Sequence, residues 1–150
     1  LIGFFPNRSS LAHLRIDLMT DIQVQEQVRI PDERRAAQAV QVQRGDYLSS
    51  HLYMFYEEPG RRPVQIRLQI KKLPDKPEAS LTFLQDAFGE NWRSVSGTET
   101  QTGLEVWVRC LPSAMTQFVR QYMDRVRVLE PPEVKEQVES ALRRDFQAYF

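Results

Sequence analysis

The alternation of apolar and polar positions is most regular in the second half of the chain. Residues 64–70 alternate strictly, and residues 104–110 alternate again after the short turn 100–103. A period of two predicts strands that each bury one face. Residues 92–98 precede the same turn, so we expect them to pair with 104–110 as a hairpin. These segments predict three strands of an antiparallel sheet.

Helical spacing of apolar residues marks three further segments. The three stripes are Leu81, Leu84, Ala87 and Phe88; Met115, Phe118, Val119, Tyr122 and Met123; and Val134, Val138, Leu142, Phe146 and Tyr149. Gly89 suits the end of the first helix, while Pro112-Ser113 and Pro132 suit the starts of the other two. A last strand, 126–129, precedes the third helix. The order β-α-β-β-α-β-α is typical of an α+β, ferredoxin-like fold with helices on one face of the sheet.

The first half of the chain predicts short strands and a connector. Residues 1–5 form an apolar segment, 6–10 favour a turn, and 11–18 alternate with Leu14 and Ile16 on one face. Residues 22–30 suggest a third strand. Three such strands need partners to be stable. The polar segment that follows is interpreted as a connector, apart from an aromatic cluster expected to pack on a domain surface: Tyr53, Phe55 and Tyr56. We therefore expect domains at 1–35 and 63–150, with 36–62 joining them.

Composition narrows the classes of protein to which the chain can belong. The 150 residues carry 20 basic and 20 acidic side chains, so no whole-molecule field draws the chain toward nucleic acid. The single cysteine, Cys110, excludes an internal disulfide framework and a thiolate zinc cluster, and it favours a reducing, cytoplasmic location. Apolar runs fall far short of the roughly 20 residues that a membrane span needs. We expect a cytoplasmic protein without a membrane segment.

Enzyme motifs are absent from the sequence. It contains no P-loop, no GxGxxG, no HExxH and no acidic metal loop. His13 and His51 stand in separate contexts, and Cys110 is expected on the apolar side of its strand. We therefore predict no paired nucleophile and base, no metal site, no cofactor and no enzymatic activity.

Several segments, taken in order, resemble one family of bacterial regulators. Leu1-Ile2-Gly3, a turn, and His13-Leu14-Arg15-Ile16-Asp17 resemble the second half of a WYL domain, in which an Arg-x-Asp strand follows the strand of the name motif. Later segments resemble the C-terminal extension of WYL proteins: Tyr53-Met54-Phe55, 64–70, Ala87-Phe88-Gly89, Val106-Trp107-Val108, Phe118, 126–131 and Tyr149. The likeness covers nearly the whole chain, although each motif alone is loose.

The resemblance implies a DNA-binding transcriptional regulator. In such proteins an N-terminal winged-helix domain binds duplex DNA, and a WYL domain of Sm-like β-barrel fold senses a nucleotide or single-stranded nucleic acid. The extension helps to dimerise the protein or to transmit the signal. On this reading residues 1–35 are the C-terminal half of the barrel, 63–150 are the extension, and the chain forms a homodimer.

The resemblance also implies a set of ligand residues: Arg15, Arg8, His13 and Asp17. The Arg15 guanidinium is able to form bidentate bonds with a phosphate or a base edge. The alternatives are an ion pair between Arg15 and Asp17, a solvated Arg8 and a surface His13. Leu18 stands where the fuller family pattern has a second basic residue, which removes one expected phosphate contact.

The open face of the predicted sheet is a second candidate site. Alternation places a set of basic residues and one aromatic opposite the core: Arg67, Lys71, Arg109, Arg125, Arg127 and Trp107. Cations combined with a stacking ring are typical of single-strand binding. The face lacks the pair of aromatics found on RNA-reading sheets, which favours a subunit or domain interface anchored by Trp107. A stand-alone ferredoxin-like module that binds nucleic acid or protein through this face is the alternative function.

Overall fold

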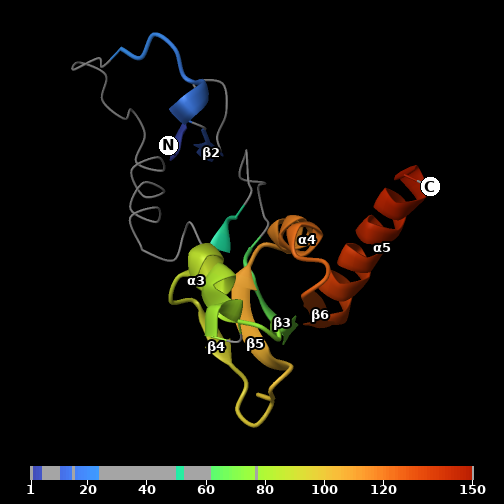
Figure 1. Cartoon of the computed structure of the whole chain (residues 1–150). Coiled ribbons are helices and arrows are strands. Elements are labelled where there is room, and N and C mark those ends of the chain that lie inside the picture. Colours follow the sequence, from blue (N-terminus) through green and yellow to red (C-terminus); the bar gives the residue numbers. More distant parts are fainter. Residues whose placement is uncertain are drawn as a thin grey trace. The chain divides into compact units, whose positions relative to one another are not determined.

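The computed structural model describes residues 2–4, 11–14, 16–23, 50–52, 62–76 and 78–149. The chain divides into two compact units, one of Leu1–Leu48 with Met54–Arg61 and the other of Ser49–Tyr53 with Arg62–Phe150. Figure 1 shows the elements along the chain. The domain boundaries expected from the sequence stay predictions.

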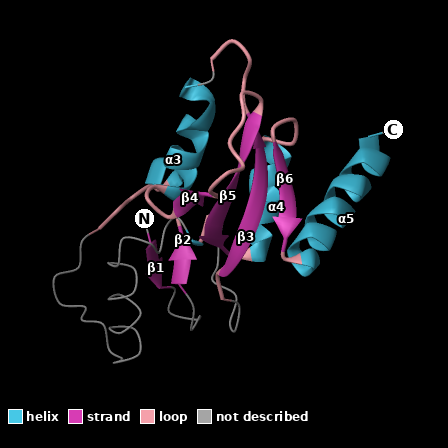
Figure 2. Cartoon of the chain, turned by 90° about the horizontal axis from the view of Figure 1, so that it is seen from below, coloured by secondary structure: helices cyan, strands magenta, loops and turns pink. Residues whose placement is uncertain are grey.

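The second unit contains a four-stranded antiparallel sheet. Its strands are β3 (Val64–Lys71), β4 (Trp92–Ser94), β5 (Gly103–Cys110) and β6 (Val126–Glu130), in the spatial order β4-β5-β3-β6 (Figure 2). The helices are η2 (Glu78–Leu81), α3 (Thr82–Phe88), α4 (Pro112–Gln121) and α5 (Pro132–Tyr149). The α+β class and the antiparallel sheet are as predicted, and the element order is compatible with a ferredoxin-like fold.

The core lies between one face of this sheet and the helices. Alternate strand residues are buried: Ile66, Leu68, Ile70, Leu104, Val106, Val108, Cys110, Val126 and Val128. Phe118 of α4 stacks against Phe83 and meets Phe88 edge-on, with ring centroids 5.8 and 4.9 Å apart. Phe83 lies outside the helical stripe expected from sequence, yet it is only 6% exposed. The opposite face of the sheet carries mainly polar side chains.

Helix boundaries match the predicted signals in most places. α3 ends at Gly89, which has φ +56°, and Pro132 opens α5. α4 begins with Pro112, but its N-cap is Leu111, which provides no side-chain hydrogen bond. β4 is shorter than the expected 92–98.

Three residues of the apolar helical stripes are exposed. Met123 is 64% exposed because α4 ends at Gln121, so the helical spacing no longer governs where its side chain points. Phe146 and Tyr149 are 65% and 86% exposed, since the last turns of α5 extend away from the sheet (Figure 1). Only Met123 was expected on a core-facing helix, and that expectation was wrong.

The first unit contains a small hairpin. β1 (Ile2–Phe4) pairs antiparallel with β2 (Leu11–His13), and its register joins Ile2 to His13. The predicted strand 11–18 is wrong beyond His13, because a 3-10 helix, η1 (Ile16–Leu18), follows and Ile16 is 63% exposed. Among the described residues the β1–β2 ladder joins three pairs, and on β2 it ends at His13. The turn 6–10 and residues 24–30 lie outside the described residues.

The predicted connector, 36–62, is described only at 50–52 and 62. There the Leu111 N–H donates to the Ser50 carbonyl at 2.9 Å, which ties this short segment to the start of α4. The aromatic cluster at 53–56 lies outside the described residues. Among those that the structure describes, no helix has the length and apolarity required to cross a membrane.

Candidate functional site

The helix-free face of the sheet collects polar and basic side chains. β3 contributes Gln65, Arg67, Gln69 and Lys71, β5 contributes Glu105, Trp107 and Arg109, and Arg93 and Arg127 come from the edge strands. Cross-strand pairing places Arg67 opposite Trp107, Arg109 opposite Gln65 and Arg127 opposite Gln69. Five predicted residues therefore share this face: Arg67, Lys71, Trp107, Arg109 and Arg127.

Arg67 is held by two carboxylates. Its Nε donates to Glu105 Oε2 at 2.8 Å, and its Nη1 donates to Glu130 Oε1 at 3.2 Å. The hydrogen bond with Glu105 raises the Arg67 pKa, and the guanidinium carbon lies 5.9 Å from the Trp107 ring centroid. Because two carboxylates compensate its charge, Arg67 is paired within the sheet and is a weaker candidate for a ligand contact than the exposed cations beside it.

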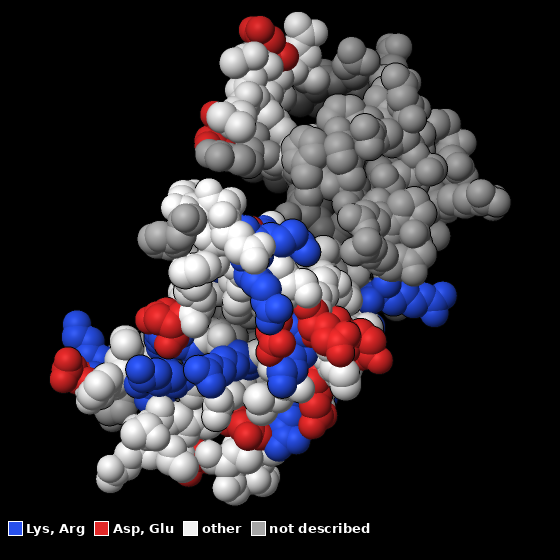
Figure 3. All heavy atoms as spheres, turned by 90° about the vertical axis from the view of Figure 1, so that its right-hand side faces the viewer, with Lys and Arg blue, Asp and Glu red and all other residues white. Residues whose placement is uncertain are grey.

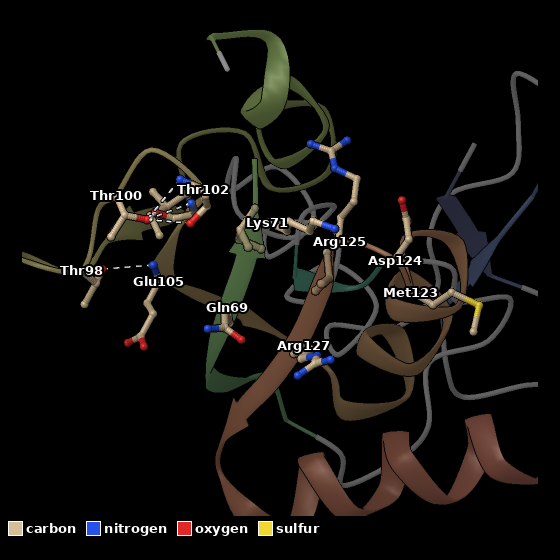
Figure 4. A pocket seen from close by; sticks show the side chains of 14 residues that line it. Gln69, Lys71, Thr98, Thr100, Thr102, Glu105, Met123, Asp124, Arg125 and Arg127 are labelled. Carbon is tan, nitrogen blue, oxygen red and sulfur yellow. Dashed lines mark hydrogen bonds between the residues drawn. The ribbon is translucent and has the colours of Figure 1, made fainter. Parts of the chain in front are cut away.

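A pocket of about 590 Å³ lies at one end of this face. It is enclosed by the end of β3, the starts of β5 and β6, the loop that joins β4 to β5, and residues 123–125 (Figure 4). We call it the end pocket. Gln69, Lys71 and Arg127 contribute exposed side chains to it. Within the described part of the chain, neither Lys71 nor Arg127 has a side-chain ion-pair partner.

Threonines shape the loop wall of the end pocket. Thr98 Oγ1 donates to the Val95 carbonyl and accepts from the Glu105 N–H, at 2.7 and 3.0 Å. Thr100 Oγ1 donates to the Gly103 carbonyl at 3.0 Å and accepts from the Gly103 N–H at 3.1 Å. These bonds fix the loop. The sequence predicts a strand to residue 98 and a turn at 100–103, and it carries no signal for the position of this loop beside Gln69 and Lys71.

Lys72 anchors the same loop from the neighbouring strand end. Its Nζ contacts Glu99 Oε1 at 2.6 Å and donates to the Thr100 carbonyl at 3.1 Å. Its own N–H donates to the Thr102 carbonyl at 2.9 Å. The loop is thus tied to β3 by both backbone and side chain.

Arg125 does not lie on the open face, which corrects the prediction from alternation. It precedes β6, and its Nη2 donates to the Ser80 carbonyl while its guanidinium carbon lies 4.5 Å from the Phe83 ring centroid. In Figure 4 its side chain points away from Arg127. The strand period applies only from Val126 onward, so alternation assigned Arg125 to the wrong side.

The ligand residues implied by the resemblance are only partly described. Arg8 and Arg15 lie outside the described residues, and the side chain of His13 does too. Asp17 is exposed and belongs to η1 rather than to a strand, so the Arg-x-Asp strand is not formed at this position. Whether these four residues share a site stays a prediction.

One hydrogen-bonded Ser–His pair was not expected. Ser50 Oγ lies 2.9 Å from His51 Nδ1, and the two residues are 4% and 8% exposed. Their burial is typical of a structural hydrogen bond that holds the segment joined to Leu111. Among the described residues, no group of three or more His, Cys, Asp or Glu side chains is placed to hold a metal ion.

Comparison with known proteins adds no family. No family model, no curated protein and no solved structure matches this chain.

Proposed function

We propose that the chain is the ligand-sensing and dimerisation region of a bacterial DNA-binding transcriptional regulator. Its effector is a nucleotide or single-stranded nucleic acid, and duplex DNA is bound through a winged-helix domain outside this chain. The region acts in the cytoplasm, without catalytic activity of its own. The proposal rests on the resemblance to a WYL domain with its extension.

The structural observation that supports it best is the open face of the sheet. Exposed cations surround the half-buried Trp107 there, and Arg67 contacts the ring. Aromatic stacking together with cationic side chains is a sequence-tolerant way to hold a nucleic-acid strand. On the side that carries α5, by contrast, basic and acidic side chains are interspersed (Figure 3).

The proposal assigns a ferredoxin-like fold to residues 63–150. The first and third strands of this segment, β3 and β5, are central in the sheet, and β4 and β6 are at its edges. That order agrees with a split β-α-β arrangement. For residues 1–35 we propose part of an Sm-like barrel, to which the β1–β2 hairpin contributes.

The dimerisation part is supported by exposed apolar side chains on the second unit. Phe146 and Tyr149 continue the stripe by which α5 buries Val134 and Val138. Exposed large apolar groups are typical of protein interfaces. Light scattering over a concentration series tests this part: we expect a dimer that Tyr149→Glu shifts toward monomer, whereas a monomeric wild type at every concentration would contradict it.

Fluorescence anisotropy with a short labelled single-stranded oligonucleotide tests whether the open face holds a nucleic-acid strand. We expect Trp107→Ala to weaken binding about 5- to 150-fold, the range for losing one base stack, and binding to fall steeply with salt. Arg143→Ala removes a charge from α5 instead of the sheet and is the matched control.

A comparison with Arg15→Ala separates the two functions. If the chain is a WYL sensor, Arg15→Ala abolishes effector binding without unfolding the protein. If it is a stand-alone module, Arg15→Ala binds like the wild type, while Trp107→Ala and Arg109→Ala are impaired. Binding of neither oligonucleotide nor nucleotide would refute both.

A further inference from the structure

The end pocket is hollow because two positions leave the sheet surface uncovered. Gly103 pairs with Lys71 across the β3–β5 ladder and has no side chain to place above it. On the other side of Lys71, the backbone neighbour is Arg125, since the Lys71 N–H donates to the Arg125 carbonyl at 2.8 Å. The Arg125 side chain turns to Ser80 and Phe83. Of Gly103, Lys71 and Arg125, which are neighbours across the sheet, only Lys71 therefore extends its side chain over the open face.

The cross-strand neighbours two residues further along β3 supply the other polar groups of the end pocket. Gln69 lies between Glu105 on β5 and Arg127 on β6. Residues two apart on a strand share a face and lie about 7 Å apart, so Gln69 and Lys71 both face the hollow. Arg127 is brought beside them by the ladder. An ammonium, an amide and a guanidinium therefore belong to residues that line the same pocket (Figure 4).

The charge balance of the end pocket favours an anion. Its carboxylates are Glu105 and Asp124. Glu105 is already paired with Arg67, with Nη2 and Oε2 2.5 Å apart. Asp124 stands at the rim, and its carboxylate points away from Arg127 (Figure 4). Lys71 and Arg127 are left as uncompensated positive charges beside the hollow.

The hydrogen-bonding capacity fits phosphate oxygens. A guanidinium binds phosphate in a bidentate manner and an ammonium binds it as a point charge. Thr98 and Thr100 use their hydroxyls to hold the loop. Because Thr100 Oγ1 donates its proton to the Gly103 carbonyl, the Thr102 hydroxyl is the donor in its 3.3 Å contact with Thr100 Oγ1, and the neutral donor left in the pocket is the Gln69 amide. The pocket volume lies within the 300–1,000 Å³ that is usual, to order of magnitude, for small-molecule sites.

We propose that the end pocket binds the phosphate group of a nucleotide, with Lys71 and Arg127 as the charged contacts and Gln69 as a neutral donor. The inference deepens the proposed function, on which it rests for the identity of the ligand. It places a phosphate site in the second unit and leaves the separate prediction for Arg15 unchanged.

Isothermal titration of the whole chain with AMP, adenosine and pyrophosphate tests the proposal. We expect AMP to bind and adenosine to bind at least tenfold more weakly. Lys71→Ala and Arg127→Ala should each weaken AMP about 10- to 150-fold, the effect of losing one charge-assisted contact. Arg143→Ala should bind AMP like the wild type. Unchanged thermal unfolding of the exposed-site variants shows that they remain folded.

The outcomes separate the pocket from the broader function. AMP binding that Arg15→Ala abolishes but Lys71→Ala and Arg127→Ala leave intact would overturn the pocket and keep the sensor. Pyrophosphate binding lost in both pocket variants, without AMP binding, would support the phosphate site and refute a nucleotide effector. Failure of both AMP and pyrophosphate to bind would overturn the inference.

Discussion

The thiol of Cys110 makes the stability of the protein depend on pH in the alkaline range. It is fully buried at the end of β5, and burial raises its pKa from 9.0 to about 12. An acid whose pKa rises on folding stabilises the folded state fully below its unfolded pKa, and this stabilisation is lost as pH rises toward the folded pKa. The window therefore runs from pH 9 to pH 12.

The expected size follows from linkage. At pH 10.5 the thiol of the unfolded chain is almost fully ionised, whereas the buried thiol is almost fully protonated. Each unit between the two pKa values corresponds to about 1.4 kcal/mol, so the unfolding free energy should fall by about 2 kcal/mol between neutral pH and pH 10.5.

Urea unfolding of the wild type and of Cys110→Ala at both pH values measures this term. At neutral pH the variant should be about 1–2 kcal/mol less stable, because a small cavity replaces the sulfur. At pH 10.5 that deficit should shrink by about 2 kcal/mol and so vanish or reverse. Lysines and tyrosines titrate in both proteins and cancel in the difference. A deficit that is equal at the two pH values would refute the reasoning.

Three further substitutions test the packing of the second unit. Gly103→Ala should lower the unfolding free energy by about 1–3 kcal/mol in thermal melts, since a Cβ would lie 2.5 Å from the Ile70 carbonyl oxygen; an unchanged melting temperature would contradict this contact. Phe118→Ala should cost about 3–5 kcal/mol in urea, and a loss below that of an exposed-site substitution would contradict its central place in the core. Asp145→Asn breaks the bidentate ion pair between Asp145 and Arg120, whose side chains are 41% and 35% exposed, respectively. The loss of unfolding free energy should therefore stay below about 1 kcal/mol and shrink with added salt.

Part of the candidate site follows from alternation alone. Arg67, Trp107, Arg109 and Arg127 lie on the open face as the strand period predicts, because each belongs to a strand whose other face is buried. The pairing of Arg67 with Glu105 and Glu130 does not follow, since it depends on which strands become neighbours. Arg67, which the strand period alone makes a candidate ligand contact, is instead paired with two carboxylates of neighbouring strands.

The first unit shows where periodicity fails. Residues 11–18 alternate, yet the strand ends at His13 and Ile16 enters η1. Alternation produces a strand only where a neighbour supplies hydrogen-bond partners, and the described ladder with β1 reaches His13. The apolar alternation therefore continues beyond His13, although the strand does not.

By itself the sequence determined the elements of the second unit and the inward face of each strand, because apolar periodicity and the Pro and Gly signals act over a few residues. Only the tertiary structure decided that Arg125 turns to Ser80 and that Gly103 meets Ile70. It also brought the 98–102 loop beside Gln69, Lys71 and Arg127. These juxtapositions depend on strand order and register, which join residues far apart in the chain and leave no local periodic trace.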